Sequence, residues 1–200
     1  MMDNIRASSS AATGSSDWAE QPGSSHWTTA ANWTPAQVPT NTARFGNSTR
    51  TEVGFVATIG ATVESIEFGD GAPSYTIRFT DPAPNAPALT ITGAGVVNSS
   101  GKPQRFVVAS SSAGYENPQL KFINSATAGG NDVEYAAGPS TPAHAAGGVI
   151  GFQNTSNAGS ASFIVRTGAG TPPSEGSTVG GEVSFSDASS ADTARFTIFG

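Results

Sequence analysis

The stretch "GFQNTSNAGSASF", from Gly151 to Phe163, decides the fold because its skeleton returns as "SFSDASSADTARF" from Ser184 to Phe196. Each copy starts with a small residue and Phe, continues through Asn or Asp and a run of small residues, and ends on Phe. A third copy opens at Phe122. The three opening Phe residues lie 30 and 33 positions apart, which is a constant period with small variations in length.

The copies agree at four positions. A Phe opens each copy, an Asn or Asp stands two positions later, an Ala six positions later, and a Val or Phe eleven positions later. These residues are Phe122, Phe152 and Phe185; Asn124, Asn154 and Asp187; Ala128, Ala158 and Ala191; and Val133, Phe163 and Phe196. The differences in length fall in the Gly- and Pro-rich segments between copies, which is typical of a coiled repeat.

One turn of a β-solenoid per copy explains this register. Equivalent residues then lie one strand spacing apart, about 4.8 Å, so that Phe stacks on Phe and Asn or Asp stacks on its counterpart. Stacked Asn side chains can extend the backbone hydrogen-bond ladder, and the small Ala residues suit tight corners. A β-sandwich of duplicated hairpins would give the same pattern, but a spacing of about 30 residues is long for it. We therefore expect an all-β fold, a parallel β-helix.

The composition is that of an extracellular or surface protein. Only 12% of the residues are charged, about half of the usual share of roughly 25%, and Gly, Ser, Thr and Ala take their place. Leu occurs only at Leu89 and Leu120, whereas Val, Ile, Phe and Thr, which suit strands, are common. The net charge of −6 provides no basic patch for nucleic acid, and no stretch is long and apolar enough to span a membrane. We expect neither nucleic acid as a partner nor a membrane span.

We expect a flexible N-terminal segment over residues 1–25 and a β-helix domain over residues 26–200. Within the domain, residues 26–60 form an N-terminal cap and residues 61–200 form the coils, with Gly/Pro-rich loops between them. The strand pattern runs to Gly200 without a polar cap. A bare terminal coil offers unpaired backbone groups, so the sequence predicts either a protein that continues beyond this C-terminus or a subunit that adds end to end.

The ionisable residues lack the spacing of a catalytic or metal site. The carboxylates closest in sequence form two pairs, Glu64 with Glu67 and Asp187 with Asp192. A glycosidase needs two carboxylates facing one bond, and we interpret both pairs as solvated surface groups. His26 and His144 lie 118 positions apart, which gives neither a zinc motif nor a Ser-His-Asp arrangement. With no Cys, thiolate metal sites are excluded. We expect no enzymatic activity, no metal and no cofactor.

Two tryptophans are the only candidate ligand-binding residues. Exposed indoles are common platforms for sugar rings, so Trp27 and Trp33 could bind a carbohydrate. The alternative is that both rings plug the open first coil of the solenoid. The sequence favours the plug, because large apolar groups are expected at a solenoid cap.

The N-terminal half resembles a known group of sequences. The stretches "WTTAANWTPAQVPTNTARF", "ATVESIEFGDGAPSYTI" and "LTITGAGVVNSSGKPQRFVV" are similar to the autotransporter-associated β-strand repeats of bacterial surface proteins, and the later copies are similar to their β-helix passenger repeats. The resemblance covers roughly residues 25 to 200. It implies a right-handed parallel β-helix that is exported to the cell surface or beyond, where it serves as an adhesin, stalk or matrix component.

We therefore expect a non-enzymatic extracellular β-solenoid with a structural or adhesive function, such as a surface stalk, an adhesin or a matrix or filament component. The alternative is a carbohydrate-binding or carbohydrate-active β-helix with a groove along one sheet. The expected partners are a second copy of the chain, bound end to end or through the N-terminal segment, and host or matrix glycans.

Overall fold

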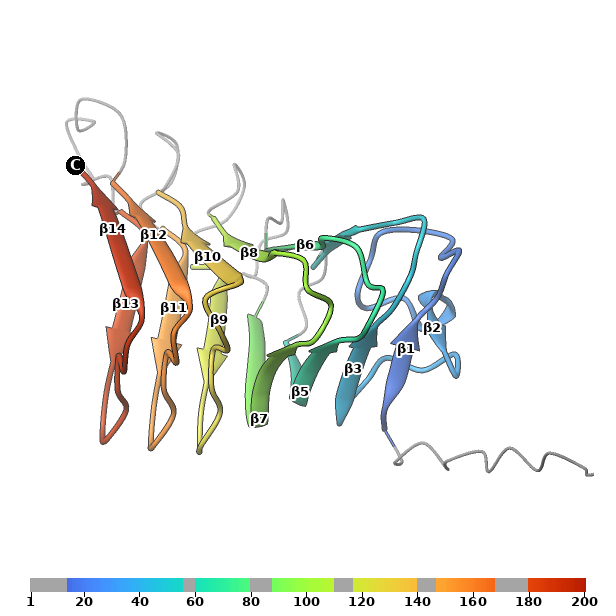
Figure 1. The fold of residues 1–200 in the computed structure, drawn as a ribbon, viewed down its shortest axis with the longest axis horizontal. Coiled ribbons are helices and arrows are strands. Elements are labelled where there is room, and N and C mark those ends of the chain that lie inside the picture. Colours follow the sequence, from blue (N-terminus) through green and yellow to red (C-terminus); the bar gives the residue numbers. More distant parts are fainter. Residues whose placement is uncertain (1–13, 56–59, 80–87, 110–116, 140–146, 168–179) are drawn as a thin grey trace, which may run out of the picture.

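The computed structural model describes residues 14–55, 60–79, 88–109, 117–139, 147–167 and 180–200, and its strands wind into a β-solenoid (Figure 1). Within these residues, the helical structure is limited to one 3-10 turn, η1 (Ala30–Asn32). No helix in the described ranges is long and apolar enough to cross a membrane. The all-β prediction and the parallel β-helix are confirmed.

One wall of the solenoid is an eight-stranded sheet in the order β13-β11-β9-β7-β5-β3-β1-β2. All of its pairs are parallel except that between β1 and β2. Its strands are β1 (Ser16–Trp18), β2 (Trp33–Thr34), β3 (Thr42–Phe45), β5 (Ala61–Phe68), β7 (Ala88–Asn98), β9 (Gln119–Phe122), β11 (Val149–Phe152) and β13 (Glu182–Phe185).

The opposite wall is a six-stranded parallel sheet in the order β14-β12-β10-β8-β6-β4. Its strands are β4 (Glu52–Gly54), β6 (Thr76–Phe79), β8 (Gln104–Val108), β10 (Val133–Ala137), β12 (Ser162–Arg166) and β14 (Arg195–Phe199). From β3 onward the chain alternates between the two walls, so each of these coils contributes one strand to each sheet, and successive coils progress from the N-terminal end to the red C-terminal end of Figure 1.

The residues that repeat in the sequence pair with each other in these sheets. Phe122 pairs with Phe152, and Phe152 pairs with Phe185. Their ring centroids lie 4.8 Å apart in each step, and the ring planes are nearly parallel, at 7° and 8°. On the other wall, Phe106, Tyr135, Phe163 and Phe196 form a second column, with steps of 4.9, 5.0 and 5.0 Å. The two columns fill the interior between the sheets.

A third, narrow ladder begins where β7 departs from the register of β5. The pairing shifts between Val63 and Ser65, so that β7 carries extra residues there. From this bulge onward, single-residue parallel bridges join Gly95, Thr127, Asn157 and Ser190 on successive coils. Gly95 has a φ of 90°, and a Cβ there would overlap the backbone of Thr127. Glycine is therefore required where the third ladder starts.

The ordered N-terminal cap begins earlier than the sequence indicated. The flexible segment was expected to extend to residue 25, but Ser16 and Asp17 of β1 pair with β3, and Trp18 is buried. β1 could not be predicted because a strand of three residues is too short to show an alternating pattern in the sequence. The part of the segment before residue 14 lies outside the described residues.

Replacement of Phe152 by Ala tests the interior column. Because its ring is fully buried between two other rings, we expect a loss of about 3–5 kcal/mol in the free energy of unfolding. Urea denaturation followed by circular dichroism measures it. The matched control is Phe196→Ala in the last coil, where the ring is 39% exposed and the loss should be clearly smaller. Equal losses at both positions would contradict the stacking.

Candidate functional site

The most regular polar feature of the solenoid is the corner that follows the strands of the eight-stranded sheet. Asn124, Asn154 and Asp187 occupy this corner on successive coils, with φ values of 58°, 59° and 58°. This left-handed conformation is unfavourable for most residues, and Asn and Asp tolerate it better than other non-glycine residues. The backbone turn therefore explains why the repeat has Asn or Asp at this position. We call these three residues the corner ladder.

The side chains of the corner ladder join successive coils. The backbone N–H of Asn124 donates to Oδ1 of Asn154 at 3.1 Å, and the N–H of Asn154 donates to Oδ2 of Asp187 at 2.9 Å. The side-chain Nδ2 of Asn124 donates to the carbonyl of Thr92 at 3.0 Å. The side-chain oxygens of Asn154 and Asp187 thus each accept a backbone N–H of the preceding coil. The sequence predicted that these residues stack, but it did not show that main-chain donors are the partners.

The repeated Ala residues lie where the turn packs closely against the next coil. Ala128 and Ala158 are fully buried, and their N–H groups donate to the carbonyls of Asn157 and Ser190 on the next coil, both at 2.9 Å. Ala191, in the last coil, is exposed. A larger side chain at the two buried positions would have to displace the coil packed against it, which is the physical reason for a small residue there.

The second interior column contains one buried hydroxyl. Tyr135 is fully buried, and its hydroxyl donates to the carbonyl of Ala128 at 2.7 Å. Burial raises the pKa of Tyr135 well above its ordinary value of 10.0, because the phenolate would lose its hydration. The ring of Tyr135 therefore fills the column, and its hydroxyl donates to a buried carbonyl.

The tryptophans form the plug of the first coil. Trp27 and Trp33 are only 0% and 2% exposed, and their ring centroids lie 5.0 Å apart in an edge-to-face arrangement. Trp27 also stacks on Phe55 at 4.8 Å, and Nε1 of Trp33 donates to the carbonyl of Trp27 at 2.7 Å. Since both indole rings face the interior, neither offers a platform to a sugar ring in this structure.

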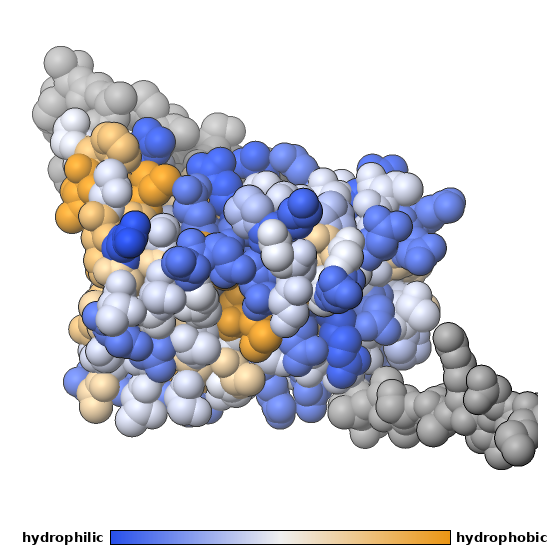
Figure 2. Space-filling view, in the orientation of Figure 1, coloured by the Kyte–Doolittle hydropathy of each residue, from blue (hydrophilic) through white to orange (hydrophobic). Residues whose placement is uncertain are grey.

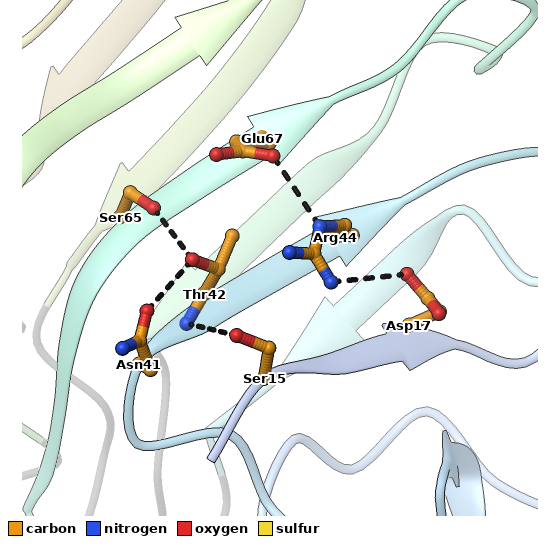
Figure 3. Close-up of polar contacts among 7 residues, drawn as sticks. All are labelled: Ser15, Asp17, Asn41, Thr42, Arg44, Ser65 and Glu67. Carbon is orange, nitrogen blue, oxygen red and sulfur yellow. Dashed lines mark hydrogen bonds and ion pairs between the residues drawn. The ribbon is translucent and has the colours of Figure 1, made fainter. Parts of the chain in front are cut away.

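Ion pairs on the outer faces also run from coil to coil. Figure 3 shows Arg44 of β3 between Asp17 of β1, at 4.0 Å, and Glu67 of β5, at 3.5 Å. On the other sheet, Glu52 pairs with Arg78 at 3.3 Å and Arg105 pairs with Glu134 at 2.8 Å. Exposed pairs of this kind contribute at most about 1 kcal/mol each. They help to fix the register rather than form a reactive centre.

The remaining ionisable residues are dispersed. Glu67 pairs with Arg44, and Asp187 accepts the N–H of Asn154 in the corner ladder. His26 lies on the surface of the cap, in a bridge with Gly54, and His144 lies outside the described residues. In the described ranges, no three His, Cys, Asp or Glu side chains are grouped as metal ligands.

The surface hollows lined by described residues are small. Three of them have volumes of about 300, 270 and 250 Å³. The second contains Arg105 and Glu134, which already pair with each other, and the third contains Arg50, whose Nε donates to the carbonyl of Pro22 at 2.9 Å. The charged groups of Arg105, Glu134 and Arg50 are thus engaged with the protein itself. The coil-to-coil ladders are the best-defined candidate site among the described residues, and their polar groups are bonded to the protein itself.

In comparisons with known proteins, no family model matches the chain, and neither a curated protein nor a solved structure matches it.

Two substitutions of Asn154 separate its backbone conformation from its hydrogen bond. Both Asn154→Gly and Asn154→Ala remove the acceptor for the N–H of Asn124, and both must adopt the positive φ of this position, but only Ala has a Cβ that makes this conformation unfavourable. We therefore expect Ala to be less stable than Gly by about 1–2 kcal/mol, measured by urea denaturation. At an ordinary strand position, Ala is the better residue of the two. A variant with Ala as stable as that with Gly would contradict the left-handed corner.

The substitution Tyr135→Phe tests the buried hydroxyl. At neutral pH it should cost about 1–2 kcal/mol, because the carbonyl of Ala128 loses its donor. Above pH 10 the unfolded chain ionises Tyr135 whereas the folded chain does not, so the native protein loses stability with rising pH. The variant lacks this loss, and the difference in unfolding free energy between the two proteins should shrink above pH 10. A difference that stays constant to pH 12 would show that the ring is accessible to solvent.

Proposed function

We propose that this chain is a structural β-solenoid that acts outside the cell as a rigid spacer, stalk or adhesive element. The observation that carries the proposal is a continuous chain of aromatic contacts through the interior, from the cap to the last coil. The steps join Trp27, Phe45, Phe68, Phe106, Tyr135, Phe163 and Phe196, with ring centroids 4.9–6.3 Å apart. The molecule is thus stabilised along its long axis.

The hydrogen bonds support the same role. In each parallel sheet they run between strands of successive coils, along the axis of the solenoid. The corner ladder and the cross-coil ion pairs add contacts in the same direction. A force that pulls the two ends apart must therefore break a full set of coil-to-coil contacts before it releases one coil. This is the arrangement expected of a load-bearing spacer.

The outer faces of the solenoid support a structural role more than a carbohydrate site. Among the described residues, the large exposed apolar side chains are Val97 and four residues of the last coil, namely Phe185, Phe196, Ile198 and Phe199. The aromatic platforms that would line a sugar-binding groove along the coils are therefore not present on the described part of the earlier coils. Charged side chains on these faces instead pair with each other from coil to coil.

The extracellular setting and the bacterial surface rest on the sequence. The low content of charged residues, together with the resemblance of residues 25 to 200 to autotransporter-associated β-strand repeats, supports an exported protein. The fold agrees with that resemblance, because a stack of parallel coils is what it implies. Adhesion to a host surface or to matrix glycans is part of the same proposal.

Single-molecule pulling from the two ends tests the mechanical role. We expect a series of force peaks in which one coil is released at a time. Each step should lengthen the chain by about 100 Å, since a coil of about 30 residues extends by about 3.3–3.6 Å per residue. The variant Phe152→Ala should weaken the peaks of the coils around β11 and leave the others unchanged. Unfolding in one step at low force would contradict a load-bearing role.

A further inference from the structure

Four Asn-x-Ser/Thr triplets occur in the described part of the chain, and this triplet is the acceptor motif for N-linked glycans. Their asparagines are Asn32, Asn47, Asn98 and Asn154. Attachment of a glycan replaces one hydrogen of Nδ2 by a bulky sugar. The nitrogen must therefore reach solvent, and it can then donate only one hydrogen bond. The structure separates the four asparagines by this requirement.

Asn32 belongs to the interior of the N-terminal cap. It is 1% exposed, and its Nδ2 donates to Oγ of Ser24 and to the carbonyl of His26, both at 2.8 Å. Its Oδ1 accepts the N–H of Ser24 at 3.1 Å. Both hydrogens of the nitrogen are thus in use in a place without room for a sugar. A glycan at this position is incompatible with the folded cap.

Two further asparagines connect successive coils through their side chains. Nδ2 of Asn98 donates to the carbonyl of Lys102 at 2.8 Å and to Oδ2 of Asp132, on the next coil, at 2.7 Å. In the corner ladder, Oδ1 of Asn154 accepts an N–H of the preceding coil, and its Nδ2 lies 3.5 Å from Oδ2 of Asp187 on the following coil. A sugar on either nitrogen would compete with the neighbouring coil for the same space.

Asn47 differs from the other three asparagines. It lies in the turn between β3 and β4 and is exposed. Within the described residues, no hydrogen bond joins its side chain to the rest of the protein. In the view of Figure 2, hydrophilic colours cover most of the N-terminal coils. A glycan on Nδ2 of Asn47 would therefore extend into solvent without displacing a coil.

The turn that carries Asn47 is anchored on both sides. On one side, the hydroxyl of Tyr75 donates to the carbonyl of Gly46 at 2.7 Å. On the other side, the N–H of Thr49 donates to the carbonyl of Glu20 at 2.8 Å, and its Oγ1 donates to the same carbonyl at 3.1 Å. Because Thr49 is the third residue of the motif, transfer of a glycan must precede the closing of this turn. The folded turn then holds the glycan at a fixed place on the first corner.

The geometry points to Asn47 as the acceptor for an N-linked oligosaccharide, in an export pathway that contains an oligosaccharyltransferase. Nδ2 of Asn47 attacks C1 of the first sugar of an oligosaccharide that is linked to a lipid diphosphate. A C–N bond forms, the bond from C1 to the diphosphate oxygen breaks, and one Nδ2 proton passes to a base of the transferase. No group is oxidised or reduced. The inference depends on export of the chain, but not on the mechanical role.

Production of the 200-residue chain with a secretion signal, in a eukaryotic cell line that attaches N-linked glycans, tests the assignment. Trypsin cleaves after Arg44 and Arg50, so Asn47 is isolated in the peptide of residues 45–50. In the secreted, folded chain, we expect mass spectrometry to find a glycan on this peptide and not on the other three asparagines. Asn47→Gln should remove the glycan. The matched control is Asn131→Gln, at an exposed Asn outside any such triplet, and it should keep the glycan.

The stability of the secreted chain gives a second test. Enzymatic removal of the glycan should leave the midpoint of urea denaturation unchanged, because the Asn47 side chain bonds to no other described residue. The inference would be overturned by failure to obtain a secreted, folded chain with a glycan at Asn47, by a folded chain with a glycan at Asn32, Asn98 or Asn154, or by a shifted midpoint. The pulling experiment uses the chain without a glycan, so the two proposals can fail separately.

Discussion

In-register stacking of successive coils is the constraint on which the rest of this structure depends. A single coil adds only one strand to each wall, and only one bridged residue, such as Thr127 or Asn157, to the third ladder. Such a coil cannot bury its own apolar side chains. Each coil is stable because it covers the one before it. The 4.8 Å steps between Phe122, Phe152 and Phe185 match the spacing of the strands that carry them, so the aromatic column and the backbone ladder support the same register.

Polar residues reinforce that register at the points where the chain changes direction. At the corner ladder, the residue type is set by the positive φ, and its side chain then accepts an N–H that the turn would otherwise leave without a partner. Tyr135 serves a similar purpose in the interior, where its hydroxyl satisfies the carbonyl of Ala128. These contacts connect residues about 30 positions apart or close a single coil, and none of them requires a ligand. The polar groups of the corner ladder and of Tyr135 are therefore bonded to the protein itself, and this is one of the observations behind the proposed structural role.

The sequence predicted those features that recur from coil to coil. The parallel coils could be predicted from Phe, Asn or Asp, and Ala at constant offsets, because residues that stack on each other in a periodic structure recur at a constant spacing in the sequence. The features that occur once were missed. β1 and β2 are too short to alternate, the shift between β5 and β7 interrupts the period, and the ion pairs of Arg44 join residues whose proximity is known only when the register is known. The left-handed corner could have been predicted from the repeated Asn or Asp, since these are the non-glycine residues that tolerate this conformation.

The most direct test of the stacked register is a measurement of contacts between the interior rings by nuclear magnetic resonance, with Phe selectively labelled. Cross-peaks should join the ring protons of Phe122 with those of Phe152, and those of Phe152 with those of Phe185, because these centroids lie 4.8 Å apart. No cross-peak should join Phe122 with Phe185, which are two coils apart. The absence of the two neighbour contacts, or a direct contact between the outer pair, would contradict the account.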